Sequence, residues 1–405
     1  MSRGRVTVIG GSMAGLFAAL ALRARGFEVG VYERAEDALA NRGAGIATHK
    51  ELYEAVRAAG VELRDEMGVT AHGRVMFDRE GAVIHEHAMH QIMTSWGLIY
   101  RFLRAQLPDE AYFPGHALSN IESQGNHVTA RFTNGAEVTA DWLIGGDGAR
   151  STVRSLVAPA VIPAYVGYFG WRGLIDEARV PQAVLDQVAH RMAFGMAPGG
   201  HWLGYLVAGP DDTLEPGKRW YNWGWYRSGD AAVLRDHLTD INGVYYENGI
   251  PHHLVRPDLV AAMRADAARH LAPQIQSIIN ATDMPFLQGM FDFSCDRLVF
   301  DRVVLIGDAA ATARPHVGMG VSKAADDAAT LAEALAADAP GALETWEQQR
   351  VRYGRAVVAW GRDLGSYIGP QPDTAEHRAK AAHHMRPEIL LSATASSTPE
   401  AFLAL

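Results

Sequence analysis

Glycines and a carboxylate near the start of the chain have the types and the spacing of a dinucleotide-binding turn. The turn is Gly10-Gly11-Ser12-Met13-Ala14-Gly15, and Glu33 follows the next apolar run. Glycines there let the backbone approach a pyrophosphate, and the N–H groups of the following helix attract its negative charge. A carboxylate beyond the second strand accepts hydrogen bonds from ribose hydroxyls. The segment therefore predicts that a dinucleotide binds here.

Two residues of this segment leave alternatives open. The usual pattern is Gly-x-Gly-x-x-Gly, and Ser12 stands where the second glycine is expected. Because serine is small, we still expect the backbone to come close to the ligand. Arg34, directly after Glu33, fits either a contact to a 2′-phosphate or a solvated surface arginine. We favour the surface position.

Two further apolar segments each end in an aspartate. They are Trp142-Leu-Ile-Gly-Gly-Asp147-Gly148 and Val303-Val-Leu-Ile-Gly307-Asp308, and Ser151 is placed to cap the helix after the first. Ligands of parallel α/β sheets bind at the carboxyl ends of the strands. Each aspartate alone also fits a helix cap. Together with the first turn, the two segments predict three strand ends at one edge of a sheet.

Aromatic residues gather between residues 161 and 282, in segments that alternate like strands. In His201-Trp-Leu-Gly-Tyr205-Leu-Val, His201 and Tyr205 fall on one face because side chains alternate with a period of two. An apolar wall that carries one imidazole and one phenol suits a small aromatic ligand. The same residues also fit an ordinary sheet with satisfied hydrogen bonds, so the strand alone leaves both interpretations open.

The elements that must hold these residues follow an α/β pattern. The β-branched, apolar runs 5–9 and 27–32 predict strands, and the Ala/Leu run 16–25 between them predicts a helix that Gly26 ends. Helices are also predicted at 324–337, 343–367 and 375–384. The strand, helix and strand at the amino end form one βαβ unit.

The composition excludes several classes of function. The 405 residues carry a net charge of −9, which argues against a nucleic-acid or anionic-membrane partner. The single cysteine, Cys295, excludes an internal disulfide and a thiolate metal cage, and it fits a cytoplasmic location. No metal site is expected, since the adjacent His383 and His384 diverge on a helix. The uncharged stretch Val6–Leu22 is interpreted as a strand, a glycine turn and a helix, and no other run approaches the ~20 apolar residues that cross a bilayer.

The three glycine-containing motifs together resemble the FAD-dependent aromatic hydroxylases, over roughly residues 5–350. The resemblance implies non-covalent FAD, with Glu33 at the adenosine ribose and Asp308 at the ribityl chain. It also implies that Asp147 and Arg154 lie near the pyrophosphate. Met319 replaces a glutamine that is frequent in the family. The residues carried over to the cofactor are Gly10, Ser12, Met13, Ala14, Gly15, Glu33, Arg34, Arg101, Asp147, Gly148, Asp308, Pro315, Gly318, Met319 and Gly320.

The resemblance also implies the architecture, which is α/β (α+β). A Rossmann-like FAD-binding domain is expected to contain an inserted antiparallel β-sheet that binds the substrate, followed by C-terminal helices. The expected boundaries are 1–71, 98–160 and 283–340 for the FAD-binding domain, 72–97 and 161–282 for the substrate domain, and 341–405 for the helices and tail.

The His-x-x-x-Tyr strand and the turn Arg314-Pro315-His316 resemble the branch of this family that hydroxylates hydroxypyridines. The continuation Lys323-Ala-Ala-Asp-Asp-Ala is close to members that act on 2,6-dihydroxypyridine. Members that act on 6-hydroxynicotinate have a histidine directly after a Gly-Ala-Gly-Ile segment. Here Gly43-Ala44-Gly45-Ile46 is followed by Ala47, and His49 comes two residues later. This departure favours the diol over the carboxylated ring.

The implied reaction consumes O₂ and NADH or NADPH, and it hydroxylates the ring through a flavin C4a-hydroperoxide. His201 is the candidate general base, because imidazole titrates near neutral pH. Tyr205 is expected to orient a ring oxygen, and His316 is the rival base. Two other classes stay open, a flavin oxidase without oxygen insertion and a non-enzymatic flavin-binding regulator. A homodimer is also left open.

Overall fold

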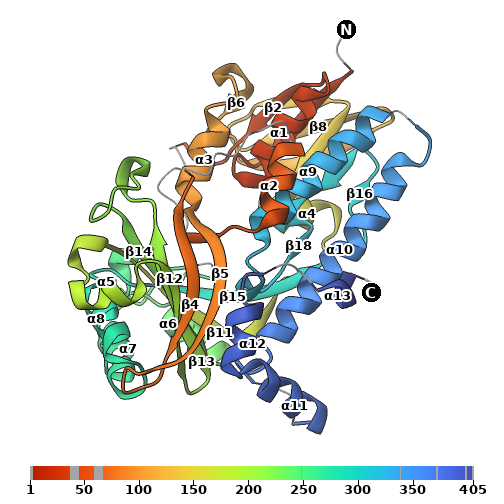
Figure 1. The fold of residues 1–405 in the computed structure, drawn as a ribbon. Coiled ribbons are helices and arrows are strands. Elements are labelled where there is room, and N and C mark those ends of the chain that lie inside the picture. Colours follow the sequence, from red (N-terminus) through yellow and green to blue (C-terminus); the bar gives the residue numbers. More distant parts are fainter. Residues whose placement is uncertain are drawn as a thin grey trace.

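Two β-sheets organise the chain. The computed structural model describes residues 3–36, 45–58, 67–247, 249–337, 339–370, 373–396 and 399–403. Figure 1 shows the amino-terminal elements together with α9 in one half of the molecule and the central segments, drawn in green, in the other half. The C-terminal helices lie against both halves.

The first sheet has six strands in the order β16-β17-β10-β1-β2-β6. Neighbours pair in parallel, except that β16 is antiparallel to β17. The carboxyl ends of β1, β10 and β17 therefore meet at one edge, which confirms the expectation from the three glycine motifs. The strands are β1 (Arg5–Ile9), β2 (Glu28–Tyr32), β6 (Tyr112–Phe113), β10 (Trp142–Gly145), β16 (Val299–Phe300) and β17 (Val303–Leu305).

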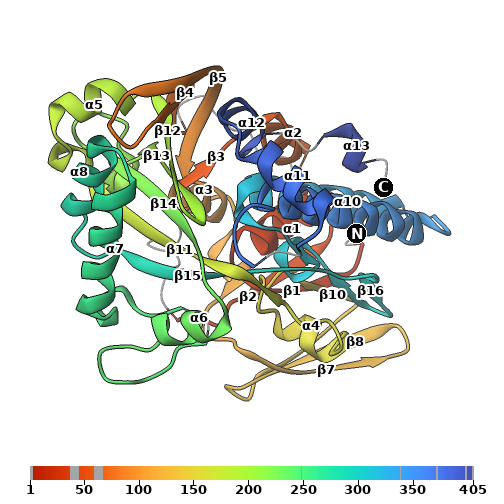
Figure 2. The same ribbon diagram turned by 90° about the horizontal axis from the view of Figure 1, so that it is seen from below.

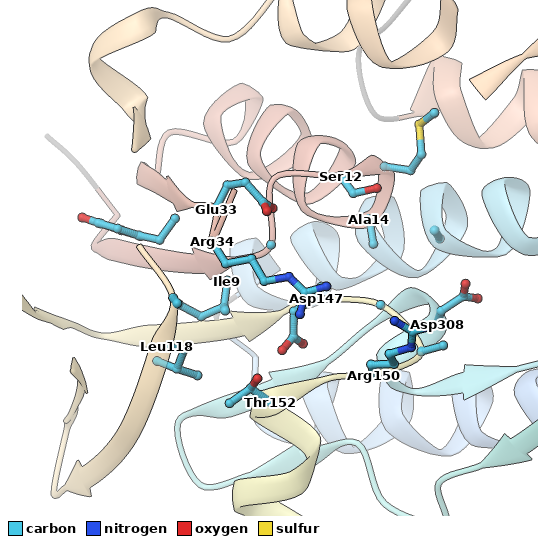
Figure 3. A pocket seen from close by; sticks show the side chains of 18 of the residues that line it. Ile9, Ser12, Ala14, Glu33, Arg34, Leu118, Asp147, Arg150, Thr152 and Asp308 are labelled. Atoms are coloured by element: carbon cyan, nitrogen blue, oxygen red, sulfur yellow. The ribbon is translucent and has the colours of Figure 1, made fainter. Parts of the chain in front are cut away.

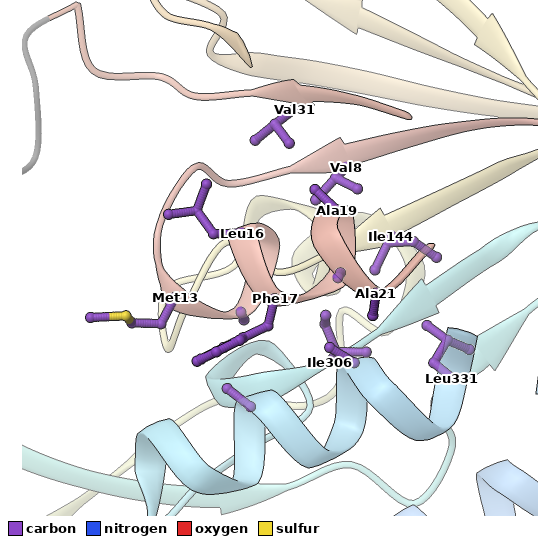
Figure 4. Packing of buried hydrophobic residues seen from close by; sticks show 14 of the residues in the cluster. Val8, Met13, Leu16, Phe17, Ala19, Ala21, Val31, Ile144, Ile306 and Leu331 are labelled. Carbon is purple, nitrogen blue, oxygen red and sulfur yellow. The ribbon is translucent and has the colours of Figure 1, made fainter. Parts of the chain in front are cut away.

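Helix α1 (Met13–Ala24) is apolar on almost every side because it lies between this sheet and helix α9 (Gly320–Ala337). Leu16, Phe17 and Ala21 are fully buried in the same cluster as Ile306, which directly follows β17 (Figure 4). A small sheet contributes Val128 to this core; its strands are β7 (Leu118–Gln124), β8 (His127–Phe132) and β9 (Glu137–Ala140).

The second sheet has nine strands in the order β18-β15-β11-β14-β13-β12-β4-β5-β3. On β13, Leu203 and Tyr205 pack in one hydrophobic cluster and Trp202 and Leu206 in another, so the expected alternation is present. The strands are β3 (Gly45–Ala47), β4 (Val69–Phe77), β5 (Val83–Ser95), β11 (Ala164–Asp176), β12 (Arg191–Ala197), β13 (Gly200–Val207), β14 (Trp220–Ser228), β15 (Phe286–Ser294) and β18 (Ala311–Thr312).

Helices cover the outer face of this sheet, where α7 and α8 bury residues such as Met263 and Ile275 (Figure 2). Because β3 and β15 also belong to the sheet, it extends beyond the expected substrate-domain segments, 72–97 and 161–282. The helices before α9 that complete the fold are α2 (Lys50–Ala58), α3 (Trp96–Arg104), α4 (Thr152–Val157), α5 (Gln182–Val188), α6 (Ala231–His237), α7 (Pro257–His270) and α8 (Pro273–Ala281).

The buried guanidinium of Arg74 connects the C-terminal segment to the nine-stranded sheet by hydrogen bonds. Arg74 of β4 is 1% exposed, and its guanidinium donates to the carbonyl oxygens of Leu391 (2.6 Å) and Thr394 and to Gln91 Oε1 (2.8 Å). Three of the oxygens that Arg74 reaches therefore belong to or follow the last turn of α12, where the helix dipole favours a positive charge. The helices of this segment are α10 (Ala342–Leu364), α11 (Ala375–His384), α12 (Pro387–Ala393) and α13 (Glu400–Leu403).

Replacing Arg74 with Met should detach this segment. The substitution leaves buried carbonyl groups without a donor, and we expect the free energy of unfolding to fall by about 3 kcal/mol. Urea unfolding and limited proteolysis at residues 387–396 measure the effect. Arg79→Met, at an exposed position beyond β4, is the matched control. Equal stability of the two variants would contradict the role given to Arg74.

Candidate functional site

A cleft of about 610 Å³ opens at the carboxyl ends of β1, β2 and β10 and beside the loop after β17 (Figure 3). The structure brings most of the predicted cofactor residues together along its walls. Those lining it are Gly10, Ser12, Met13, Ala14, Glu33, Arg34, Asp147, Gly148, Asp308 and Gly320.

The glycine turn has no room for side chains where β1 enters α1. Gly10 has φ +102°, and a Cβ there would lie 2.6 Å from the carbonyl oxygen of Gly146. A Cβ on Gly15 would lie 1.8 Å from the carbonyl oxygen of Gly10. The N-cap residue Ser12 makes no side-chain cap hydrogen bond. The first N–H groups of α1 therefore face the cleft without a side-chain cap, as a pyrophosphate site requires.

Two carboxylates stand at opposite ends of the cleft (Figure 3). Glu33 is 6% exposed, and its oxygens accept hydrogen bonds from the backbone N–H groups of Gly11 (2.7 Å) and Ala35 (2.9 Å). No donor within the described part of the chain reaches the Asp308 carboxylate, and burial raises the pKa of Asp308. Asp308 is therefore available to a ligand that brings hydroxyl groups.

The segment after β10, which contains Asp147, contributes both to a helix cap and to the wall of the cleft. Asp147 accepts hydrogen bonds from the Ser151 hydroxyl and the Val153 N–H (3.1 Å), and burial raises its pKa. Ser151 in turn accepts from the Arg154 N–H at 2.8 Å, which confirms the predicted cap. The Arg154 side chain does not line the cleft, because it donates to Ala149 O (2.7 Å); Arg150 lines the cleft instead.

Five predicted cofactor residues lie outside the walls of the cleft. Gly15 lies in the first turn of α1 and has no room for a Cβ. Arg101 of α3 forms a bidentate ion pair with Asp212. Pro315 begins a short 3₁₀ helix, and Gly318 follows it with φ +66°. Met319 is 1% exposed in an apolar cluster with Val317 and Trp360. For these residues contact with the cofactor stays a prediction.

Two buried histidines from distant segments meet on the inner face of the nine-stranded sheet. His201 of β13 is 0% exposed and His316 is 2% exposed, and their ring centroids are 5.4 Å apart. Tyr367 Oη lies 2.6 Å from His201 Nδ1, and Tyr168 Oη lies 2.8 Å from His316 Nε2. The remaining ring nitrogens, His201 Nε2 and His316 Nδ1, are buried without a partner among the described residues. The two rival bases of the sequence analysis are therefore neighbours.

Aromatic rings and one cation surround these two imidazoles. The Tyr226 ring centroid lies 4.6 Å from that of His316 and 5.1 Å from that of His201. Arg172 donates to the Tyr226 hydroxyl at 3.1 Å. Unpartnered nitrogens inside an aromatic shell are groups that a small polar ring would satisfy.

Tyr205 lies on the same face of β13 as His201 and is 5% exposed. A Cβ added to Gly45 would lie 2.7 Å from Cε2 of Tyr205, so β3 passes close to this ring. Gly43 and Ala44, the first half of the Gly-Ala-Gly-Ile segment, are outside the described residues. The Tyr205 hydroxyl has no hydrogen bond to any part of the chain that the structure describes, so it too is available to a ligand.

Comparison with known proteins decides the family. Residues 165–292 match the family described as "FAD binding domain-like". A 2,6-dihydroxypyridine 3-monooxygenase from Paenarthrobacter nicotinovorans is 32% identical over 368 residues, which cover 90% of this chain and 91% of that one. A 6-hydroxynicotinate 3-monooxygenase from Pseudomonas fluorescens is 27% identical over 82% of each chain.

The chain belongs to the FAD-dependent aromatic hydroxylases.

Solved structures agree with this hydroxylase fold. The structure of 2,6-dihydroxypyridine-3-hydroxylase from Arthrobacter nicotinovorans matches with a TM-score of 0.85 at 29% identity, over 92% of this chain and 96% of that one. HpxO from Klebsiella pneumoniae, complexed with FAD and uric acid, matches with a TM-score of 0.73 at 22% identity, over 99% of this chain and 95% of that one. The expected α/β architecture is confirmed.

The residues of the cleft fit the cofactor of this hydroxylase family. A glycine turn with no space for a Cβ, the uncapped start of α1 and the unpartnered Asp308 carboxylate are the features that an adenine dinucleotide with a polyol chain requires. Within the described ranges, no helix combines the length and the apolar character needed to span a bilayer.

Four residues that surround the hydroxylase's histidines were missed in the sequence. Tyr168, Arg172 and Tyr226 lie in aromatic strands whose general character was noted, but their contacts depend on how β11, β14 and the 315–317 turn pack. Tyr367 follows α10, and its hydroxyl meets His201 across 166 positions of the chain. No local pattern signals that contact.

His201 was chosen as the candidate base because imidazole titrates near neutral pH, and burial changes its pKa. Burial lowers the pKa of His201 to about 3, helped by the charge of Arg172, so the imidazole is neutral at neutral pH. Burial likewise lowers the pKa of His316 well below its usual value. Neither ring therefore titrates near pH 6.5 in the substrate-free protein.

This shift predicts that the hydroxylase loses stability in acid. Since a histidine in the unfolded chain has a pKa near ~6.5, the unfolded state binds more protons than the folded state between about pH 6.5 and 3. Stability therefore falls as the pH falls through that window. From pH 7.5 to 5.5, wild type should lose about 1.4 kcal/mol more than His201→Gln, measured by urea unfolding. Equal losses would show that His201 charges readily in the folded protein.

Proposed function

We propose that the protein adds one oxygen atom to a small hydroxypyridine, 2,6-dihydroxypyridine at C3, at the expense of O₂ and NADH or NADPH. The observation that carries the proposal is the pair of unpartnered nitrogens, His201 Nε2 and His316 Nδ1, on rings 5.4 Å apart. Two hydrogen-bonding groups that close together suit one ring with two oxygen substituents. The similarity to the dihydroxypyridine monooxygenase supports the same substrate.

Each part of the site has a role in this reaction. Bound FAD, reduced by the nicotinamide cofactor, supplies the activation of O₂. The start of α1, Glu33 and Asp308 would hold that cofactor, and the aromatic strands around the histidines exclude water from the ring.

His201 would accept the proton of a ring hydroxyl at Nε2 while Tyr205 orients the ring. The O–H bond breaks, its electron pair stays on the ring oxygen, and the neighbouring carbon becomes more nucleophilic. Because burial lowers the pKa of His201 to about 3, the imidazole starts neutral. The imidazolium that forms is stabilised by the negative ring oxygen beside it, an opposite charge in a low-dielectric site.

Arg172 is the observation that favours a second substrate, 6-hydroxynicotinate. Its guanidinium is close enough to depress the pKa of His201 and hydrogen-bonds Tyr226, so it could pair with a ring carboxylate. The relative from Pseudomonas fluorescens acts on that ring. The ratio of kcat/KM for the two rings separates these candidates.

The test is an oxidation screen with the FAD-loaded protein. NADH and NADPH are each supplied with a panel of hydroxypyridines and phenols, and the product mass is measured. We expect 2,6-dihydroxypyridine to stimulate NAD(P)H oxidation and to gain one oxygen atom, with NMR locating it at C3. Stoichiometric H₂O₂ with every ring unchanged would reject a hydroxylase function in favour of an oxidase. A yellow protein that no ring stimulates would favour a flavin-binding regulator.

A further inference from the structure

A chain of contacts leads from a buried ion pair to the tyrosine that hydrogen-bonds one of the two histidines. Arg314 Nε donates to Asp292 Oδ2 at 2.8 Å, and Asp292 is 3% exposed. The Arg314 guanidinium also lies against Tyr168, with its central carbon 5.6 Å from the ring centroid, and its charge acts on the Tyr168 hydroxyl. Tyr168 Oη in turn lies 2.8 Å from His316 Nε2. The order of the chain is therefore Asp292, Arg314, Tyr168, His316.

The chemistry of arginine sets the direction of this chain. A guanidinium is a cation that has only donors, so the Tyr168 hydroxyl turns its oxygen toward Arg314 and its proton away from it. A phenol has one proton, and Tyr168 therefore donates it to His316 Nε2. An imidazole that accepts at Nε2 carries its own proton at Nδ1. That atom is the buried nitrogen of His316 without a partner in the described structure.

His201 is held differently. Tyr367 Oη lies 2.6 Å from His201 Nδ1, but no arginine or other cation within the described residues lies against Tyr367. Nδ1 of His201 can therefore donate to the Tyr367 oxygen, which leaves Nε2 free to accept a proton. The two imidazoles are not equivalent, although both are buried and both are paired with a tyrosine.

We propose that Tyr168 is a positioning residue that fixes His316 as a hydrogen-bond donor through Nδ1, so that proton acceptance falls to His201 alone of the two histidines. This inference rests on the proposed function and narrows its substrate class. A donor beside an acceptor suits a ring with one carbonyl-type oxygen and one hydroxyl group. The pyridone form of a dihydroxypyridine, with its carbonyl at His316 and its hydroxyl at His201, has this arrangement.

The tautomer can be measured without turnover. We would label the histidine rings with ¹⁵N in the FAD-loaded protein and assign His316 from the signals lost in His316→Asn. Wild type should show a protonated Nδ1 and an unprotonated Nε2 from about pH 8 to pH 6. Tyr168→Phe should lose this single tautomer, whereas Tyr165→Phe, a control whose hydroxyl donates to Gly229 O, should keep it. A protonated Nε2 or an imidazolium in wild type would overturn the proposal.

Substitutions of His316 can distinguish whether this residue acts as a hydrogen-bond donor or as a general base. Asparagine offers an N–H near the position of Nδ1 but cannot act as a base, and alanine offers neither. We expect His316→Ala to raise KM for the ring at least tenfold and His316→Asn to restore most of that loss, with kcat less affected than KM. Loss of kcat by 100-fold or more in the asparagine variant, at normal FAD content, would identify His316 as the base and overturn the proposal.

Failure of this inference can be distinguished from failure of the proposed function. The tautomer of His316 is a property of the protein and does not depend on which ring is the substrate. A screen that selects another ring therefore rejects the substrate and leaves the tautomer result standing. A wrong tautomer rejects the role of Tyr168 even when 2,6-dihydroxypyridine is hydroxylated.

Discussion

The Gly15→Ala variant is expected to be purified without FAD. The new Cβ would lie 1.8 Å from the carbonyl oxygen of Gly10 and 3.2 Å from a methyl group of Val8. The first of these is a backbone atom, so relief requires α1 to move away from β1. Such a shift displaces the N–H groups that face the cleft, and the pyrophosphate contact depends on their position. We expect the affinity for FAD to fall at least 100-fold, measured by titrating the apoprotein with FAD and following flavin fluorescence.

The control for Gly15→Ala is a glycine in a turn away from the walls of the cleft. Gly125 lies between β7 and β8 with φ +60°, and a Cβ there would meet nothing within 4 Å. Asparagine tolerates this backbone conformation, so Gly125→Asn should bind FAD like wild type. Normal FAD binding by Gly15→Ala would contradict the assignment of this turn to the cofactor.

His201→Gln should lower the rate of ring hydroxylation by about 100- to 10,000-fold, the usual contribution of a general base. Glutamine keeps a polar group near the position of Nε2 but cannot take a proton from the ring hydroxyl. Reduction of the bound flavin by NADH or NADPH does not use this proton and should continue. Oxygen would then be consumed with release of H₂O₂. The measurement compares NAD(P)H oxidised, H₂O₂ released and product formed in the same reaction.

His383→Gln is the matched control for this variant. His383 is an exposed residue of α11, and its change should leave all three quantities as in wild type. The FAD content and melting temperature of both variants establish that the site is intact. A coupled reaction at the wild-type rate in His201→Gln would remove His201 from the role of base.

The cleft proposed to hold FAD was predictable because its signals are local. The turn at Gly10–Gly15, Glu33 after β2 and Asp308 after β17 each follow a short apolar strand. Parallel pairing of β1, β10 and β17 then places these ends at one edge. The exceptions have local causes too. Arg154, expected near the pyrophosphate, turns inward because Ala149 O accepts its guanidinium, and Arg150 takes the position at the cleft.

The proposed substrate site was only partly predictable. His201, Tyr205 and His316 were identified, since one strand and one turn carry them. Their environment was not, and burial lowers the pKa of His201 to about 3 where a value near neutrality was expected. The desolvation of a side chain depends on everything packed around it, which a strand of alternating residues does not reveal.

The sequence by itself determined the elements and the cofactor motifs, because β-strand alternation, helix periodicity and the conformational demands of glycine act over a few residues. Only the tertiary structure decided which distant groups touch. Tyr168 meets His316 across 148 positions, Tyr367 meets His201 across 166, and Arg74 holds Leu391 across 317. Such contacts arise when two sheets and the C-terminal helices pack together, and that packing is decided by the burial of whole faces rather than by any short run of residues.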